Sequence, residues 1–143
     1  MANVIPDSFK TDLLKGTFNF DSSGGSTFKL ALYTDISGLT TSTTAFTTSN
    51  EVSTSGTSYS SGGNTLTNNG VAIASNIAFV DFADLTFSSV TLTADSALIY
   101  KDTSNEAVLV LDFGGDKTAT NGDFVIQFPT ASSSAAIIRL GNA

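Results

Sequence analysis

The chain has 143 residues, a formal net charge of −7 at pH 7, and no cysteine, histidine or tryptophan. A chain of this length is expected to fold as one domain with a core large enough to need no disulfide. The absence of histidine and cysteine excludes Ser-His-Asp triads, Cys-His dyads and ordinary zinc sites. The acidic charge, with Arg139 as the single arginine, argues against a surface that binds nucleic acid.

Residues 1–16 are predicted to form an N-terminal arm followed by a short helix. The helix is expected over residues 8–15, with Gly16 in the position of a C-terminal stop. Phe9 and Leu13, at i and i+4, give it one apolar edge. A helix of about eight residues is unstable alone in water. It must therefore dock, either on its own sheet or on a neighbouring subunit.

Residues 17–143 are predicted to form a single β domain. Residues 17–20 place Phe18 and Phe20 on one face of a first strand, and a turn follows at residues 22–25. The segment TFKLALYT, residues 27–34, alternates apolar side chains with a period of two. That period indicates a strand, because an amphipathic helix would repeat at 3.6 residues.

Residues 37–67 differ in character, since 18 of these 31 positions are serine or threonine. We call this segment the excursion. A disordered linker is one interpretation, and a partner-contacting loop is another. We favour a long extended excursion with edge strands near residues 44–52 and 64–68. Three large side chains would hold it in place: Phe46, Val52 and Tyr59.

The next part of the chain is predicted to hold several short strands. Asn68-Asn69-Gly70 indicates a turn. Phe87 falls out of phase with the residues after it, so Ser88-Ser89 predicts a β-bulge. Strands are expected over residues 71–74, 77–82, 86–93 and 96–101.

Residues 106–128 are predicted to supply a hairpin at the centre of the core. Residues 108–113 and 123–128 are its expected strands, and the first of them is expected to be buried on both faces. Gly114-Gly115 and Asn121-Gly122 tolerate the positive φ angles of tight turns. With a last strand at 135–140, about eight strands result. The fold class is thus all-β, a two-sheet sandwich of jelly-roll or Greek-key type, with helix below about 15% of the chain.

Two groups of acidic residues invite a chemical interpretation. Asp81 and Asp84 suit an acid–base pair, but surface turn carboxylates are the expected reading. A second group lies in what is predicted to be one loop, where its oxygens could bind Ca²⁺, although its spacing matches no EF-hand: Asp112, Asp116, Asn121 and Asp123. We predict no catalytic residues, no cofactor and no metal. We also expect no signal peptide and no membrane-spanning helix.

Six segments, in this order, resemble a group of small virion structural proteins from tailed bacteriophages. The resemblance spans nearly the whole chain, but its motifs are strands and turns. Two departures stand out, because Phe18 replaces a histidine and Phe87 a tryptophan common in that group. Both changes keep a bulky ring. The segments are SFKTDLLKG at 8–16, TFKLALYT at 27–34, NEV at 50–52, SYSSGG at 58–63, SALIYK at 96–101 and VLDFGGDK at 110–117.

The resemblance implies a non-enzymatic cement or decoration protein on the capsid surface of a virion, made in the host cytoplasm. Its expected partner is the major capsid protein, with copies of the chain forming a homo-oligomer or symmetric array. No nucleic acid or membrane partner is expected. The alternative is a tail or fibre module that binds host carbohydrate through Tyr33, Tyr59 and Tyr100. Candidate partner contacts are Phe9, Leu13, Phe46, Val52 and Tyr59.

Overall fold

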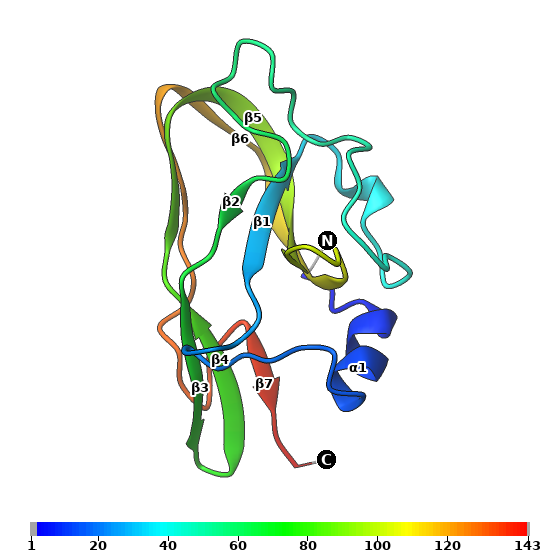
Figure 1. Ribbon diagram of the computed structural model, residues 1–143. Coiled ribbons are helices and arrows are strands. Elements are labelled where there is room, and N and C mark those ends of the chain that lie inside the picture. The colour runs from blue at the N-terminus through cyan, green and yellow to red at the C-terminus, as the bar shows by residue number, and fades with distance from the viewer. Residues whose placement is uncertain (1–2, 143) are drawn as a thin grey trace.

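The computed structural model describes residues 3–142 and is an all-β sandwich of two antiparallel sheets. Strands hold 46% of the residues and helices 8%, which confirms the predicted fold class and the low helix content. Figure 1 shows the sheets lying along one side of the N-terminal helix, with the chain passing between them more than once. Strands far apart in the chain therefore become neighbours, as in Greek-key proteins.

The first sheet has the order β2-β1-β5-β6. Its two long strands, β5 and β6, form one hairpin ribbon that arches along the molecule and over its top (Figure 1). β1 pairs along its length with the second half of β5, from Phe28 opposite Lys101 to Tyr33 opposite Ser96. The strands are β1 (Phe28–Tyr33), β2 (Asn64–Thr65), β5 (Leu85–Lys101) and β6 (Ala107–Ile126).

The second sheet has the order β3-β4-β7, from β3 (Asn68–Ala74), β4 (Ile77–Phe82) and β7 (Ile138–Leu140). Ser75 and Asn76 connect β3 to β4 with φ angles of 50° and 63°. Positive φ at both central residues is the mark of a type I′ turn, which matches the twist of a tight hairpin. The turn predicted at residues 68–70 is wrong, because these residues begin β3 and form only an irregularity in it.

The ribbon replaces the hairpin predicted within residues 106–128, and that prediction is wrong. Residues 108–113 and 123–128 do not pair with each other; nearly all of both segments belongs to β6, which pairs throughout with β5. Gly114, Gly115 and Asn121 do have positive φ angles, as their residue types indicated. They form bulges in a continuous strand, because β5 remains beside them and supplies hydrogen-bond partners on either side.

The bulges bend the ribbon. Ala94 pairs with Lys117 and Ser96 with Asp112, so the single residue between them on β5 faces residues 113–116. The bulge predicted at Ser88-Ser89 is confirmed by a register shift there and by a φ angle of 55° at Ser89. Extra residues on one strand increase its local bend and twist. The ribbon can therefore curve around the core.

Helix α1 (Asp7–Leu14) docks on the protein's own core. Phe9 is 2% exposed, and its ring centroid lies 4.9 Å from that of Phe18 and 6.2 Å from that of Phe20. Residues 17–20 form no strand with any described residue, so that prediction is wrong, although both phenylalanines point into the core as expected. A 3₁₀ turn, η1 (Ile36–Gly38), is the other helical element in residues 3–142.

The first sheet is buried on both faces. Between the two sheets lies a large apolar cluster that includes Leu30, Val108 and Phe82. The opposite face of the first sheet carries a smaller apolar cluster that includes Tyr33 and Val110. The N-terminal arm and the excursion cover this cluster. The prediction that residues 108–113 form a strand buried on both faces holds for residues 108–110, whereas residues 111–113 are half-buried.

Candidate functional site

The excursion closes the free edge of β1. Thr34 donates its N–H to the Asn50 carbonyl at 2.8 Å, and Val52 donates to the Leu32 carbonyl at 2.9 Å. Leu66 donates to the Phe28 carbonyl at 2.9 Å, so the contacts span the strand from end to end. The predicted edge strands shrink to the short β2 and two isolated bridges. The backbone of the excursion thus pairs within its own chain. It covers an edge of β1 that would otherwise be open to pairing with other chains.

Glu51 and Tyr59 lock the excursion onto β1. The Tyr59 hydroxyl donates to Glu51 Oε1 at 2.8 Å and accepts from the Leu32 N–H at 3.0 Å. Glu51 also accepts hydrogen bonds from the Gly62 N–H at 2.6 Å and from the Ser61 hydroxyl at 2.7 Å. The Glu51 carboxylate therefore holds the surrounding loop in place. Hydrogen bonds to an ionised acceptor of this kind belong to the strong class.

Of the five predicted partner contacts, three are buried within this fold and two are half-buried. Phe9, Val52 and Tyr59 are 2%, 4% and 3% exposed. Leu13 is half-buried against the main core, and Phe46 stacks on the Tyr100 ring at 4.6 Å between centroids. The apolar edge of the helix and the large side chains of the excursion are therefore used to fold this chain, and the three buried side chains present no surface to a partner.

All three tyrosines are buried. Tyr33 donates its hydroxyl proton to the Thr47 carbonyl, and Tyr100 donates to the Gly62 carbonyl, both at 2.7 Å. Burial raises the pKa of Tyr33 and Tyr59 well above the ordinary value of 10.0, and it raises the pKa of Tyr100 to about 12. A carbohydrate reader needs exposed aromatic rings, and these rings are not exposed.

The acidic residues also serve the fold. Asp81 accepts a hydrogen bond from the Asn69 side chain at 2.8 Å, and Asp84 accepts one from the Phe128 N–H at 2.8 Å. The four residues considered for calcium lie along β6 and not in one loop, so that placement is corrected. Within residues 3–142, no group of three or more His, Cys, Asp or Glu side chains is arranged to hold a metal ion. No helix in the same range is long and apolar enough to cross a membrane.

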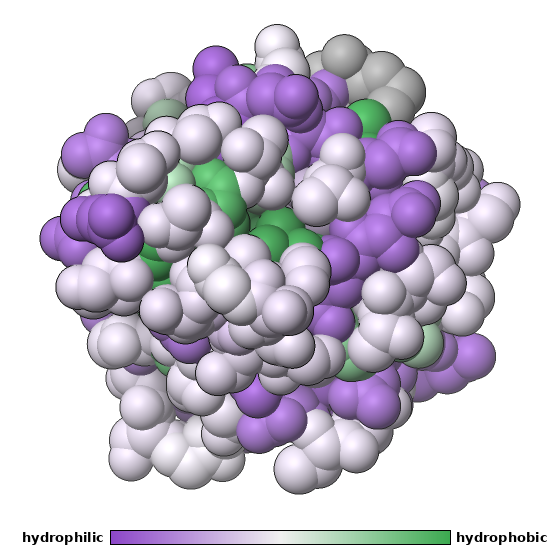
Figure 2. All heavy atoms as spheres, turned by 90° about the horizontal axis from the view of Figure 1, so that it is seen from above, coloured by the Kyte–Doolittle hydropathy of each residue, from purple (hydrophilic) through white to green (hydrophobic). Residues whose placement is uncertain are grey.

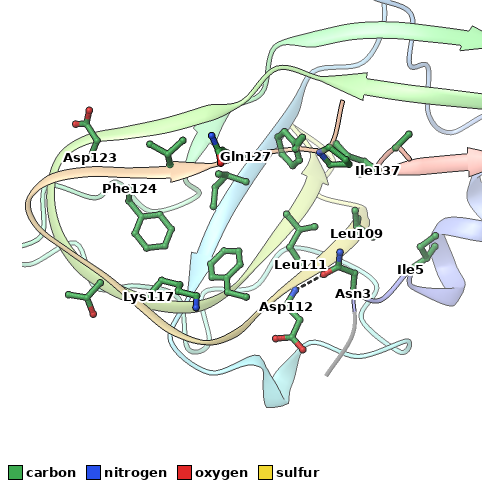
Figure 3. A pocket seen from close by; sticks show the side chains of 17 residues that line it. Asn3, Ile5, Leu109, Leu111, Asp112, Lys117, Asp123, Phe124, Gln127 and Ile137 are labelled. Atoms are coloured by element: carbon green, nitrogen blue, oxygen red, sulfur yellow. Dashed lines mark hydrogen bonds between the residues drawn. The ribbon is translucent and has the colours of Figure 1, made fainter. Parts of the chain in front are cut away.

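A groove of about 690 Å³ lies on the inner side of the curved β6 (Figure 3). Leu111 and Phe124 point into it from facing parts of the strand, whereas Asp123 points away. Ile5 of the arm and Ile137, just before β7, close its other side. Leu109, Phe113, Ile126 and Phe128 add to the apolar wall.

The N-terminal arm is fixed beside this groove. Val4 and Val110 exchange two backbone hydrogen bonds of 2.9 Å and 2.8 Å, and the Asn3 side chain accepts one from the Asp112 N–H at 2.8 Å. Lys117 and Gln127 supply polar groups among the lining residues. The groove has the size of a binding site for an apolar side chain or a small ligand. No sequence pattern indicated this groove, because its walls come from segments more than 100 residues apart.

The upper face of the molecule is mostly polar. Seen from above, it shows neutral and hydrophilic side chains, and hydrophobic atoms are visible chiefly in a central hollow (Figure 2). Comparisons with family models, with curated proteins and with solved structures found no match to the chain.

Proposed function

We propose that the protein is a non-enzymatic structural protein of a tailed-phage virion, a cement or decoration protein on the outside of the capsid. It binds the shell and bridges neighbouring copies of the major capsid protein. The observation that carries this proposal is the resemblance of six segments, spread over residues 8–117, to small phage virion proteins. The all-β sandwich is compatible with that class of protein.

The use of the polar groups supports a structural role. Glu51, Asp81 and Asp84 each accept hydrogen bonds that hold loops or strand ends in place. A general acid or base needs an open position beside a substrate, and these contacts occupy the carboxylates with the fold itself. The alternative of a carbohydrate-binding tail module is less well supported, because its three candidate tyrosines are buried.

The groove beside the N-terminal arm is the contact surface that we propose for the shell. Its apolar wall suits a bulky apolar side chain from a capsid subunit, and the arm fixes one of its sides. Contacts of modest strength are sufficient, since a protein held at one site is at high effective concentration for the next. Attachment through fit and apolar contact also predicts that moderate salt removes little of the protein, because salt screens charge interactions.

The test compares phage particles that carry the wild-type protein, no protein, or a groove variant. Particles without the protein should lose DNA at a lower temperature. Ile137→Asp places a charge in the groove and should reduce the number of bound copies, whereas Thr54→Asp, on the exposed excursion, should not. The melting temperature of each free variant shows whether it is folded. If folded Ile137→Asp attaches like the wild type, the groove is not the contact.

A further inference from the structure

The outer part of the β3–β4 hairpin, residues 70–80, lacks charge. No aspartate, glutamate, lysine or arginine occurs from Val52 to Val80, although the whole chain has a net charge of −7. In Figure 1 the hairpin forms the end of the molecule opposite the arch of the β5–β6 ribbon. Two copies of an acidic protein repel each other over most approaches. The hairpin is the part where they can meet without that repulsion.

The outer half of the hairpin exposes apolar side chains on one face. Val71 is 54% exposed and Ile73 is 75% exposed, and the two residues share a face of β3. Leu140 of β7, which is 58% exposed, lies on the same face, because both Ile73 and Leu140 pair with Ala78. Ala72 is exposed on the opposite face.

The outer edge of β3 is also open. β3 has β4 as its neighbour on one side, and no backbone hydrogen bond from elsewhere in residues 3–142 reaches residues 71–74. The outer edges of β1 and β6 are protected. The excursion covers β1, the N-terminal arm covers the first part of β6, and Asp116, Lys117 and Asp123 place charges on the rest. An uncharged, apolar, uncovered edge is the kind that pairs with another strand.

We propose that β3 pairs in antiparallel fashion with β3 of a second copy, so that the two second sheets join into one. A two-fold axis normal to the sheet keeps the apolar faces of both copies on the same side. With the axis at Ala72, Val71 of each copy lies opposite Ile73 of the other. Such β-branched cross-strand pairs stabilise antiparallel sheets. Assembly stops at two copies, because each copy has one open β3 edge and the pairing occupies it.

This inference does not rest on the proposed function, because it concerns the free protein in solution. A second copy is the occupant that the charges favour. The edge is self-complementary, and pairing it with itself brings no charged side chain of the hairpin against another. A filament would instead require β3 to pair with a different edge, whereas pairing β3 with itself uses the open β3 edges of both copies.

A single cysteine tests the register. In an antiparallel pair, directly opposed Cα atoms lie about 4.5–5.5 Å apart, which a disulfide can span. Ala72→Cys, in a chain that has no other cysteine, should therefore give a covalent dimer under mild oxidation. Ser55→Cys, in an exposed loop, is the control. Equal rates of cross-linking for the two variants would overturn the proposed register.

Sedimentation of the uncross-linked protein tests the association itself. The wild type should be dimeric, and Ile73→Lys should weaken the dimer about tenfold or more, since a lysine then faces Val71 of the other copy at two places across the axis. Thr54→Lys adds the same charge elsewhere and should leave the dimer intact. Ile73 is largely exposed in the single chain, so its substitution should leave the melting temperature of the monomer unchanged. A monomeric wild type, larger open assemblies, or an unaffected Ile73→Lys dimer would each overturn the proposal.

Discussion

Replacing Tyr59 by phenylalanine removes one oxygen from the point where the excursion is held to β1. The hydroxyl accepts the Leu32 N–H at 3.0 Å and donates to Glu51 at 2.8 Å. The side chain is 3% exposed, so water cannot take the place of the lost oxygen. The aromatic ring remains, and its packing against Phe87, at 5.8 Å between centroids, is unchanged. The substitution therefore isolates the hydrogen bonds.

The expected loss is about 1–3 kcal/mol, the range for a buried donor left without an acceptor. It should not exceed this range, because Glu51 keeps its hydrogen bonds from Gly62 and Ser61. The assay is equilibrium unfolding in urea, which gives the free energy of unfolding directly. The change should appear in the midpoint of the urea transition and not in its slope. The slope depends on the surface exposed on unfolding, which is nearly the same in the variant and the wild type.

Tyr33→Phe is the matched control. Its hydroxyl donates to the Thr47 carbonyl in a part-buried position, where water can reach the acceptor. We expect a loss of about 1 kcal/mol or less from that variant. If Tyr59→Phe is no more destabilising than Tyr33→Phe, then the Tyr59 hydroxyl does not hold the excursion on β1, and the reasoning is refuted.

Three further predictions concern the stability of the same fold. Phe9→Ala should cost about 3–5 kcal/mol in unfolding free energy, because the helix packs this ring into the core; a loss below about 1 kcal/mol would mean that the helix is not part of the core. Gly63→Ala should prevent folding or cost more than Gly56→Ala, since an added Cβ at position 63 would clash with the Leu30 carbonyl, whereas the one at 56 meets nothing within 4 Å. Equal melting temperatures for the two would contradict this. From neutral pH, stability should be constant up to about pH 10 and then fall, because the unfolded chain loses tyrosine protons near its ordinary pKa of 10.0 while folded Tyr100 keeps its proton until about pH 12. Tyrosinate absorbance should rise together with unfolding, and a rise in the folded protein near pH 10 would contradict the burial.

The strands with clear alternation were predictable from the sequence. Residues 27–34 and 77–82 became β1 and β4 with nearly the same bounds, because each has a period of two and turn residues beside it. Gly114 and Asn121 show the limit. Their residue types indicate positive φ correctly, but positive φ serves a turn or a bulge equally well. The partner strand decides between them, and the partner is a matter of tertiary structure.

For a related reason, the sequence could not show which surface the candidate contact residues meet. An apolar side chain in a polar stretch, such as Val52 or Tyr59, indicates that the side chain is in contact with another surface. It does not indicate which surface that is. Here the surface is the edge of β1 in the same chain. The open edge of β3 was also not predictable, because the neighbours of a strand, and not its residues alone, decide whether it lies at an edge.

The most direct test of the central claim is the number and position of copies on a purified particle, obtained from a reconstruction together with protein quantification. The proposal predicts copies over the whole outer shell, in a fixed ratio to the major capsid protein set by the lattice. Each copy should contact more than one shell subunit. Copies confined to the tail, or no copies on the shell, would contradict the cement assignment.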